Sequence, residues 1–555
     1  MAEESKPVDP TKDPKASTVE SDDESGSDGG SVQQPDATSS TASSKKKNKK
    51  KKKAKGKEKA DEASAEQIAG ERIMKSIKDL PDSQLAELMR HNPALLNELR
   101  GKDGGSVSST AQALKGLKLQ DLMTGLASSS KNVKDAGSFK FWAEQPVPQF
   151  GEKPAPQEGP REVKKIEDIS KEPKPLGVEG FRWVTMDLTN EEELAEVEKL
   201  LEGHYVEDDA AIFRLKYTKS MLKWSLLTPG WKKQWHVGVR YGNVLAAFIS
   251  AIPLEIRVRD KVLHSSEVNF LCIRKKLRHK RLAPELIKEI TRVCNLEDVW
   301  QAIYTGGIIL PRPVSSCRYF HRPIDYVKLE SVGFCQAPPG KYDWQVRKYK
   351  LPTETTTPGL RAMETRDVDA VHELLHRYLK RFDLAPVFTK DETIHWLLNP
   401  DNPNEDKVVW SYVVQDDSGK ITDFFSFYCL ESSVNPDPKK PGQTPKHSSI
   451  RAAYLFYYAT EAGLTTPFDK AGLKKRLNAL MGDALILAMK NKFDVFNALS
   501  LMDNALFLEQ QKFGPGDGQL HYYLFNYNAK PIPGGVDASN KLDEKTLSGI
   551  GFVQL

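Results

Sequence analysis

Cysteine is scarce in this sequence, which has only 5 cysteines among 555 residues. No two of them have the paired spacing that metal-binding cysteines show. So few thiols in so long a chain are typical of a reducing compartment. The five are Cys272, Cys294, Cys317, Cys335 and Cys429.

Long apolar runs and an N-terminal secretory signal are also missing. No stretch approaches the roughly 18 consecutive apolar residues that a membrane-spanning helix requires. The N-terminus is rich in Ser, Asp and Pro instead of being basic and then apolar. We therefore expect a soluble protein of the cytoplasm that does not insert stably into membranes.

The net charge is small but unevenly distributed. The formal charge is +5, from 81 Lys and Arg against 76 Asp and Glu. Residues 1–44 carry ten acidic residues and three lysines, and the run from Lys45 to Lys59 carries eleven lysines and one glutamate, so the chain after residue 59 is nearly neutral. Bulk positive charge is therefore not its main means of binding. The lysine run can bind phosphates of RNA or of a ribosome in a salt-sensitive manner, or it can serve only as a solubilising tail.

Composition separates the N-terminal quarter from the rest of the chain. Residues 1–60 are poor in apolar residues and rich in Ser, Asp and Lys, which predicts a disordered acidic and then poly-lysine tail. Residues 61–138 carry Ile, Leu and Met at helical spacing, followed by a stretch rich in Gly, Ser and Lys. This pattern predicts short helices and a linker. The folded body is expected to begin at residue 139.

Strand and helix patterns alternate within the body. Residues 266–275 predict a strand, 277–283 a short basic loop, 284–294 a helix and 301–307 a second strand. A similar order recurs later, where a strand, a helix, a strand, a helix and a strand are expected over 449–460, 473–492, 494–501, 504–511 and 520–527. Two related α/β halves are the simplest interpretation.

Six cations lie within eight positions between the first strand and its helix. A helix N-terminus offers unpaired N–H groups and partial positive charge, so this arrangement predicts a site for a phosphorylated ligand. A solvated basic turn is the alternative. The segment RHKRLA has the form Arg-x-x-Arg-x-Ala and resembles the loop by which acetyltransferase-like folds hold the pyrophosphate of coenzyme A. The six cations are Arg274, Lys275, Lys276, Arg278, Lys280 and Arg281.

A series of ordered blocks resembles the N-myristoyltransferase family. The blocks are VNFLCIRKKLRHKRLAPELIKEITR, YTGG, CRYFHRPI, AAYLFYYAT, FDVFNAL, KFGPGDG and GIGFVQL. EVNFLCI and KFGPGDG are the two signatures of that family, and the resemblance covers residues 139–555.

The resemblance implies an α/β (α+β) fold of two acetyltransferase-like (GNAT-like) halves in a pseudo-twofold arrangement. The half at 139–345 would bind acyl-CoA, and the half at 346–555 would bind the peptide and end in a catalytic C-terminus. The implied reaction transfers myristoyl from myristoyl-CoA to the N-terminal glycine amine of nascent or cleaved proteins by direct attack on the thioester. It implies a monomer and no metal.

The resemblance also assigns residues to the chemistry. The backbone N–H groups of Phe270 and Leu271 would form an oxyanion hole, and Asn269 and Thr305 would lie near the substrate amine. Without the resemblance, Phe270 and Leu271 would be two core residues of a buried strand. Both descriptions can hold, because a strand that bulges releases its N–H groups. Amine attack on a thioester needs no covalent intermediate, so no cysteine is required as a nucleophile.

Further residues are assigned to the two substrates in the same way. Those for acyl-CoA are Lys140, Phe141, Trp142, Phe270, Leu271, Cys272, Ile273, Arg278, His279, Lys280, Arg281, Leu282 and Ala283. Those for the peptide are Tyr205, Glu207, Asp208, Asp209, Phe213, Tyr217, Tyr319, His321, Tyr454, Asp517, Gly518 and Leu520. By composition alone, the three acids would form a solvated loop and GPGDG a turn. The chain departs from the family's common residues at Phe139, Ala210 and His279.

The chain ends on LSGIGFVQL, with apolar residues at Ile550, Phe552, Val553 and Leu555. Chain termini are usually frayed, so the simple interpretation is a buried final strand. A second interpretation concerns the Leu555 carboxylate. A glycine amine has a reference pKa of about 7.7 to 8.0 and must lose a proton before it attacks. We therefore expect the Leu555 carboxylate, with a pKa raised by burial, to be the general base.

Two other functions fit parts of the sequence. One is a non-catalytic adaptor that binds a ribosome or RNA through its lysine run and only sequesters lipid or peptide. The other is a lysine acetyltransferase of the same fold, from which acyl-chain length would distinguish a myristoyltransferase.

Overall fold

The computed structural model describes residues 140–149, 152, 157–207, 212–307, 309–399, 406–436, 444–537 and 539–555. The segments expected at 1–60 and 61–138 lie outside these residues, as do Phe139, Asp208, Asp209 and Ala210. The backbone is described at Lys140, His279 and Asp517, but their side chains are not.

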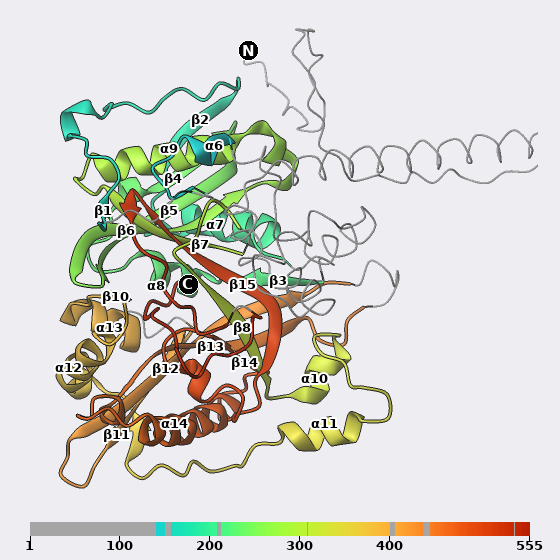
Figure 1. Ribbon diagram of the computed structural model, residues 1–555. Helices are drawn as coiled ribbons and strands as arrows, with labels where there is room; N and C mark the ends of the chain where they lie inside the picture. Colours follow the sequence, from blue (N-terminus) through green and yellow to red (C-terminus); the bar gives the residue numbers. More distant parts are fainter. Residues whose placement is uncertain are drawn as a thin grey trace, which may run out of the picture. The chain divides into compact units, whose positions relative to one another are not determined.

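The elements of the first half follow one another along the chain in Figure 1, from cyan through green to yellow. The helices are α6 (Lys140–Ala143), α7 (Glu191–His204), α8 (Lys219–Leu226), α9 (Leu282–Asn295), α10 (Tyr326–Ser331) and α11 (Tyr342–Tyr349), with 3-10 turns η2 (Ile166–Asp168), η3 (Lys233–Trp235) and η4 (Lys275–Lys280). The strands are β1 (Gly159–Pro160), β2 (Phe181–Thr185), β3 (Phe213–Lys216), β4 (His236–Tyr241), β5 (Val244–Val258), β6 (Lys261–Ile273), β7 (Gln301–Gly306) and β8 (Ser315–Pro323).

The second half continues from yellow to red in the same figure. Its helices are α12 (Val368–Leu379), α13 (Lys390–Leu398) and α14 (Lys470–Lys490), with 3-10 turns η5 (Thr365–Asp367), η6 (Glu461–Gly463) and η7 (Asn504–Leu506). Its strands are β9 (Leu360–Ala362), β10 (Leu384–Pro386), β11 (Val409–Gln415), β12 (Ile421–Val434), β13 (Ser449–Thr460), β14 (Val495–Leu499), β15 (Gly514–Phe525) and β16 (Tyr527–Asn528).

One 14-stranded sheet contains every described strand except β1 and β16, which pair with each other. Its main path is β2-β4-β5-β6-β7-β15-β8-β14-β13-β12-β11-β9. Most neighbours are antiparallel, but β6 pairs with β7 in parallel across helix α9, and β13 pairs with β14 in parallel across helix α14. The mixed α/β fold predicted from the sequence is confirmed.

The order of elements is repeated in the two halves. The series β2-α7-β3-α8-β4-β5-β6-α9-β7 corresponds to β9-α12-β10-α13-β11-β12-β13-α14-β14. Each series contains three consecutive antiparallel strands and then a parallel strand that follows a crossover helix. The exact boundary at residue 345 stays a prediction.

The two halves exchange strands. β8 follows β7 in the chain but pairs with β14, whereas β15 follows β14 but pairs with β7. The short strands cross over as well, because β3 pairs with β12 and β10 pairs with β5. In Figure 1 the red β15 runs between the two sets of strands, and the chain end lies close to it. The centre of the sheet therefore belongs to both halves.

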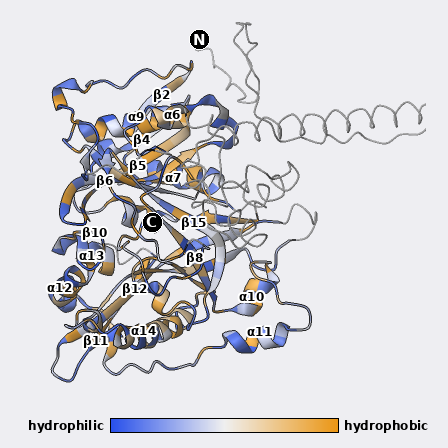
Figure 2. Ribbon diagram, in the orientation of Figure 1, coloured by the Kyte–Doolittle hydropathy of each residue, from blue (hydrophilic) through white to orange (hydrophobic). Residues whose placement is uncertain are grey.

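Helix α9 shows how the sequence produces these elements. Leu282, Leu286, Ile290 and Val293 recur at helical spacing and are buried against the sheet. Burial of each such side chain stabilises the fold by about 1.5 to 3 kcal/mol. In Figure 2, helices such as α12 and α14 carry both hydrophilic and hydrophobic residues, as expected for helices that cover a core with one face.

Three local predictions were wrong. The basic loop at 277–283 lies in the 3-10 helix η4 and the start of α9. The helix expected at 504–511 is only the 3-10 turn η7, followed by further turns. The last residues form no regular strand, since only isolated bridges link Ser548 to Gly534 and Ile550 to Leu384.

Among the described helices, none is long and apolar enough to cross a membrane.

Candidate active site

A cavity lies between helix α9 and strands β6 and β7. Its volume is about 180 Å³, and it is partly open to solvent. Apolar side chains form most of its wall, including Leu271 on β6, Ile287 and Ile290 on α9, and Trp142 and Tyr304, whose rings stack with centroids 5.5 Å apart. Asn269, Thr305, Gln554 and Leu555 line the same cavity, and Ser266, Asn295 and Gln301 add polar groups elsewhere in its wall. A mostly apolar cavity with a few polar groups suits a long apolar ligand that carries a reactive polar group.

Strand β6 bulges where it borders this cavity. Phe248 pairs with Cys272 and Ser250 with Asn269, so Ile249 of β5 faces two residues of β6, Phe270 and Leu271. Phe270 takes a left-handed backbone conformation with φ of 57°. This conformation is strained for a residue other than glycine, and such strain is common at functional sites. The bulge turns the Phe270 and Leu271 backbone out of regular pairing with β5.

Asn269 connects strand β6 to the end of the chain. Its Nδ2 donates to Oε1 of Glu267 at 2.8 Å, and its Oδ1 accepts from Nε2 of Gln554 at 2.7 Å. Gln554 Nε2 also donates to the carbonyl of Val268 at 3.1 Å. Burial raises the pKa of Glu267 to about 7, although the hydrogen bond from Asn269 works against this shift. The penultimate residue is thus fixed to the bulged strand.

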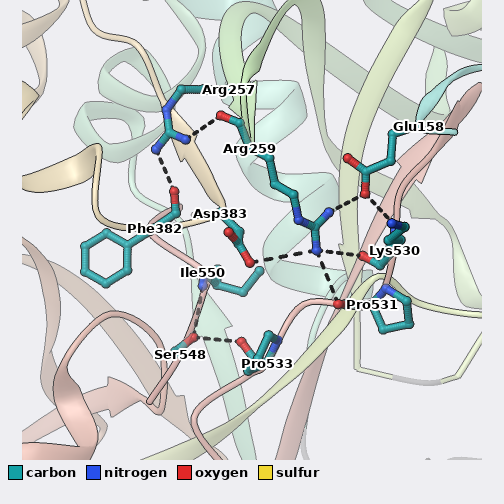
Figure 3. Close-up of polar contacts among 10 residues, drawn as sticks. All are labelled: Glu158, Arg257, Arg259, Phe382, Asp383, Lys530, Pro531, Pro533, Ser548 and Ile550. Carbon is teal, nitrogen blue, oxygen red and sulfur yellow. Dashed lines mark hydrogen bonds and ion pairs between the residues drawn. The ribbon is translucent and has the colours of Figure 1, made fainter. Parts of the chain in front are cut away.

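The segment before the chain end is anchored by the contacts drawn in Figure 3. Oγ of Ser548 donates to the carbonyl of Pro533 at 3.2 Å and accepts from the N–H of Ile550 at 3.0 Å. Beside it, the Arg259 guanidinium lies 3.8 Å from the Asp383 carboxylate. The other partners of Arg259 are the carboxylate of Glu158 and the carbonyls of Lys530 and Pro531.

Tyrosine hydroxyls hold the final residues. Tyr522 Oη donates to the carbonyl of Phe552 at 3.0 Å, and the N–H of Val553 donates to Tyr457 Oη at 3.0 Å. Both tyrosines are buried, and so are Ile550, Phe552 and Val553. These hydrogen bonds replace the ladder of the final strand that the sequence pattern predicted, which explains why the tail is ordered without being a strand.

Several of the residues assigned to the peptide lie in two groups of aromatic rings, the first of which also contains Phe270, assigned to the acyl donor. Tyr205, Tyr217 and Phe270 contact one another with centroids 5.0 to 5.8 Å apart. Tyr205 also hydrogen-bonds to the backbone of Phe270, and burial raises its pKa to about 12. Tyr205 lines the cavity, so this first group lies at the bulge.

The second group surrounds Asn497 on β14. His321 Nδ1 lies 2.7 Å from Asn497 Oδ1, and Tyr454 hydrogen-bonds to the same side chain. Gly518 lies against Tyr319, because a Cβ there would stand 3.4 Å from the ring. Of the remaining peptide residues, Phe213 packs edge-on against Phe334, and Leu520 packs on the core.

Glu207 is already paired within the chain. Its carboxylate lies 2.9 Å from Arg214 and 2.5 Å from Lys275. Partial burial works to raise the pKa of Glu207, but hydrogen bonds from Lys275 and Arg214 outweigh it and lower the pKa. A peptide lysine would therefore have to compete with two internal cations.

The residues assigned to acyl-CoA divide by position. Trp142, Phe270 and Leu271 line the cavity, whereas Cys272, Ile273 and Leu282 are buried in the cores beside it and Ala283 packs against them. Phe141 packs on the ring of Trp142. Arg278, Lys280 and Arg281 are exposed at the start of α9, where Arg278 donates to the carbonyl of His204 at 2.6 Å.

Sequence reasoning missed several residues of the site. Glu267 stands within EVNFLCI, and a carboxylate inside an apolar strand was a signal that could have identified it. Gln554, Tyr457 and Asn497 carry no such signal, because their contacts join segments far apart in the sequence. Among the described residues, no group of three or more His, Cys, Asp or Glu side chains is arranged to hold a metal ion.

Comparison with known proteins gives a consistent result. Residues 161–317 match the model of the N-terminal domain of myristoyl-CoA:protein N-myristoyltransferase, and residues 331–553 match that of its C-terminal domain. The glycylpeptide N-tetradecanoyltransferase of Neurospora crassa is 59% identical over 572 residues, which cover 100% of this chain and 99% of the relative. That of Aspergillus fumigatus is 54% identical over 85% of this chain and 94% of its own length.

Solved structures agree with these relatives. A crystal structure of Saccharomyces cerevisiae N-myristoyltransferase with bound myristoyl-CoA superimposes with a TM-score of 0.71 at 47% identity. The match covers 75% of this chain and 99% of the yeast chain.

Proposed function

This chain is a member of the myristoyl-CoA:protein N-myristoyltransferase family, and from that premise we propose that its chemistry takes place in the cavity between α9, β6 and β7. It is an acyltransferase that moves a tetradecanoyl group from myristoyl-CoA to the N-terminal glycine of proteins. One observation carries the proposed site: Asn269, Phe270, Leu271, Thr305 and Leu555 line a single, mostly apolar cavity.

The proposed mechanism needs only groups of this chain and the two substrates. The Leu555 carboxylate takes one proton from the glycine ammonium, beside the side chains of Asn269 and Thr305. The neutral amine then attacks the thioester carbonyl. The backbone N–H of Leu271 and that of Phe270, which would leave Tyr205 Oη, stabilise the oxyanion. When the C–S bond breaks, the thiolate leaves and takes up the second proton of the amine. The Leu555 carboxyl returns its own proton to solvent.

The peptide is proposed to lie along the two aromatic groups. The first group, at the bulge, would cover the acceptor glycine, and the second, around Asn497, would contact the residues that follow. The segment GPGDG, expected to be a turn, lies at the start of strand β15, where the pairing with β8 is irregular. Gly516 in this segment supports the arrangement, since a Cβ there would stand 2.5 Å from His321 Nε2 in the second group.

Mass spectrometry tests the function directly. The full chain is mixed with a glycine-initiated peptide and acyl-CoAs of several lengths. A tetradecanoyl group on the N-terminal amine is expected to be the main product. Transfer of acetyl to lysine would favour the acetyltransferase alternative, and binding without transfer would favour the adaptor.

The exposed cations at the start of α9 are proposed to hold the phosphates of the acyl donor. Replacing Arg278 and Arg281 by Ala is expected to weaken acyl-CoA binding by about tenfold, and more at low salt than at high salt, because an exposed ion pair is worth about 0.2 to 1 kcal/mol and two are removed. Calorimetry measures the effect, and peptide binding should change little. The matched control replaces Arg366 and Lys390, two exposed cations elsewhere. Unchanged acyl-CoA affinity would contradict this role.

The N-terminal segment is proposed to locate the enzyme and not to serve its chemistry. The lysine run supports a salt-sensitive contact with ribosomes in the cytoplasm. Deleting residues 1–100 is expected to leave turnover of a short peptide within about threefold while abolishing co-sedimentation with ribosomes at low salt. Loss of turnover in a folded truncated chain would contradict the proposal. The same preparation, in analytical ultracentrifugation, tests the monomeric state that we propose.

A further inference from the structure

Glu267 is a buried carboxyl group that the proposed mechanism does not use. It lies on β6, with 5% of its surface exposed. It lines a second, narrow cavity of about 20 Å³, together with Thr228, Glu392 and Leu555. Leu555 is common to this cavity and to the one beneath α9, so Glu267 stands behind the residue that carries the proposed base.

The hydrogen bonds around Asn269 depend on the direction of its amide. Nδ2 points to the Glu267 carboxyl group, and Oδ1 points to the Gln554 amide nitrogen. If the Asn269 amide were reversed, two oxygens would face each other at Glu267 and two nitrogens at Gln554. An ionised Glu267 can only accept hydrogen bonds, so in this form it permits one direction of the Asn269 amide and excludes the other.

We propose that Glu267 is a positioning residue for acyl transfer, which fixes the Asn269 amide and, through Gln554, holds the Leu555 carboxylate at the cavity. This inference rests on the proposed role of Leu555. Asn269 and Gln554 are themselves 6% and 7% exposed, so water cannot easily take over either hydrogen bond. Gln554 and Leu555 are joined by a peptide bond, so fixing the Gln554 side chain restricts where the Leu555 carboxylate can lie.

The hydrogen bond between Glu267 and Asn269 is expected to depend on pH, which a contact between groups that do not titrate would not. The titratable groups around Glu267 belong to Glu392 and the terminal residue Leu555, which line its cavity, and to Tyr428 and Tyr457 on β12 and β13. Burial raises the pKa of both tyrosines far above neutrality, so they stay uncharged. Glu267 itself titrates near pH 7. The hydrogen bond that Asn269 donates to Glu267 is stronger above this pH, because a hydrogen bond to an ionised acceptor is stronger than one to a neutral acceptor.

Two substitutions at Glu267 separate positioning from packing. Glu267→Leu removes the acceptor and is expected to lower the single-turnover rate by about 10- to 100-fold, since misplacing a catalytic group by 1 Å can cost that much. Acyl-CoA affinity and peptide KM should stay near wild type. Glu267→Gln keeps an acceptor oxygen of the same shape and should remain within about threefold at pH 7. Equal rates in all three proteins would overturn the inference.

A double-mutant cycle tests the route through the chain end. Appending one glycine after Leu555 removes the proposed base, so Glu267→Leu should cost almost nothing more in that background. If the glycine alone is harmless, the role of Leu555 fails; if the glycine is harmful but Glu267→Leu is not, only the present inference fails. Should Glu267→Leu not fold, Gln554→Leu breaks the other end of the same network. Gln554→Leu is expected to lower the single-turnover rate as much as Glu267→Leu would, and a normal rate would overturn the inference.

A stability measurement checks the carboxyl group itself. Folded wild type holds the Glu267 proton up to pH about 7, against about 4.5 for an exposed glutamate. The contribution of the protonated Glu267 to the free energy of unfolding is therefore fully present below pH 4.5 and is lost as the pH rises to 7. Between pH 4.5 and 7 the denaturation midpoint of wild type should fall relative to that of Glu267→Gln. Above pH 7 the difference between the two midpoints should stay constant. A constant difference would mean a solvated carboxylate, which would overturn the inference.

Discussion

Deleting Leu555, or appending one glycine after it, is expected to slow acyl transfer by about 100-fold or more, the range for loss of a general base. At neutral pH a glycine amine with a reference pKa of about 7.7 to 8.0 is mostly ammonium, which cannot attack a thioester. The Leu555 carboxylate can remove that proton only from a fixed position. Hydrogen bonds to the three preceding residues, Phe552, Val553 and Gln554, supply the fixation.

Single-turnover kinetics measures this effect without interference from product release. Acyl-CoA affinity and thermal stability should stay near wild type, because Ile550 and Phe552 still anchor the segment. The matched control is Leu555→Met, which changes the side chain but keeps the carboxylate, and it should act within about threefold of wild type. A glycine-extended chain with the normal rate would refute the assignment and leave the apolar tail with a purely structural role.

The elements around this site were predictable where their patterns are local. Leu286, Ile290 and Val293 have the spacing of one helix face, and the strand after α9 has nearly its predicted bounds. The strand before it was placed correctly at 266–273 but begins earlier, at Lys261. The basic segment was harder, because η4 and α9 meet at Arg281, which adopts a left-handed conformation with φ of 54°. No residue preference identifies such a junction when the residue is not glycine.

The contacts that complete the site were not predictable from local patterns. The exchange of β8 and β15 between the halves depends on pairing across the whole fold, and equally apolar strands allow other orders. Gln554 and Asn269 are 285 positions apart in the sequence. Neither residue type indicates a partner at that distance. The family resemblance assigned Asn269 to the site but gave no reason to consider Glu267, whose proposed role depends on a hydrogen bond that only the folded chain contains.

The long axis of the cavity beneath α9 runs along strands β6 and β7. Ser266 pairs with Ala302 in the parallel register of β6 and β7, while Leu271 and Thr305 lie several residues further along the same strands. The lining from Ser266 to Leu271 spans roughly 16 Å at about 3.3 Å per residue. Cys294 lies at the Ser266 end, because its thiol hydrogen-bonds to that residue. The reactive groups lie at the other end, so we expect the terminal methyl of the acyl chain near Cys294.

Cys294→Trp is therefore expected to shorten the acyl chain that the enzyme accepts. The indole would occupy the space of about four methylenes, and at about 0.8 kcal/mol for each buried methylene the loss is roughly 3 kcal/mol, or more than 100-fold in affinity for myristoyl-CoA. Octanoyl-CoA, which does not reach this end, should bind within about threefold of wild type. Calorimetry with acyl-CoAs of increasing length measures the chain length above which the affinity of the variant falls below that of wild type.

The matched control is Cys294→Val, which removes the thiol without adding a ring and should leave the length preference unchanged. Ala302→Phe adds bulk from the opposite wall, in case the indole is too large for the α9 core. Because Cys294 and Ala302 lie on different elements but border the same end of the cavity, both bulky variants should reject long chains and keep short ones. If a folded Cys294→Trp protein binds myristoyl-CoA normally, the acyl chain takes another path, and the direction inferred from the strand register is wrong.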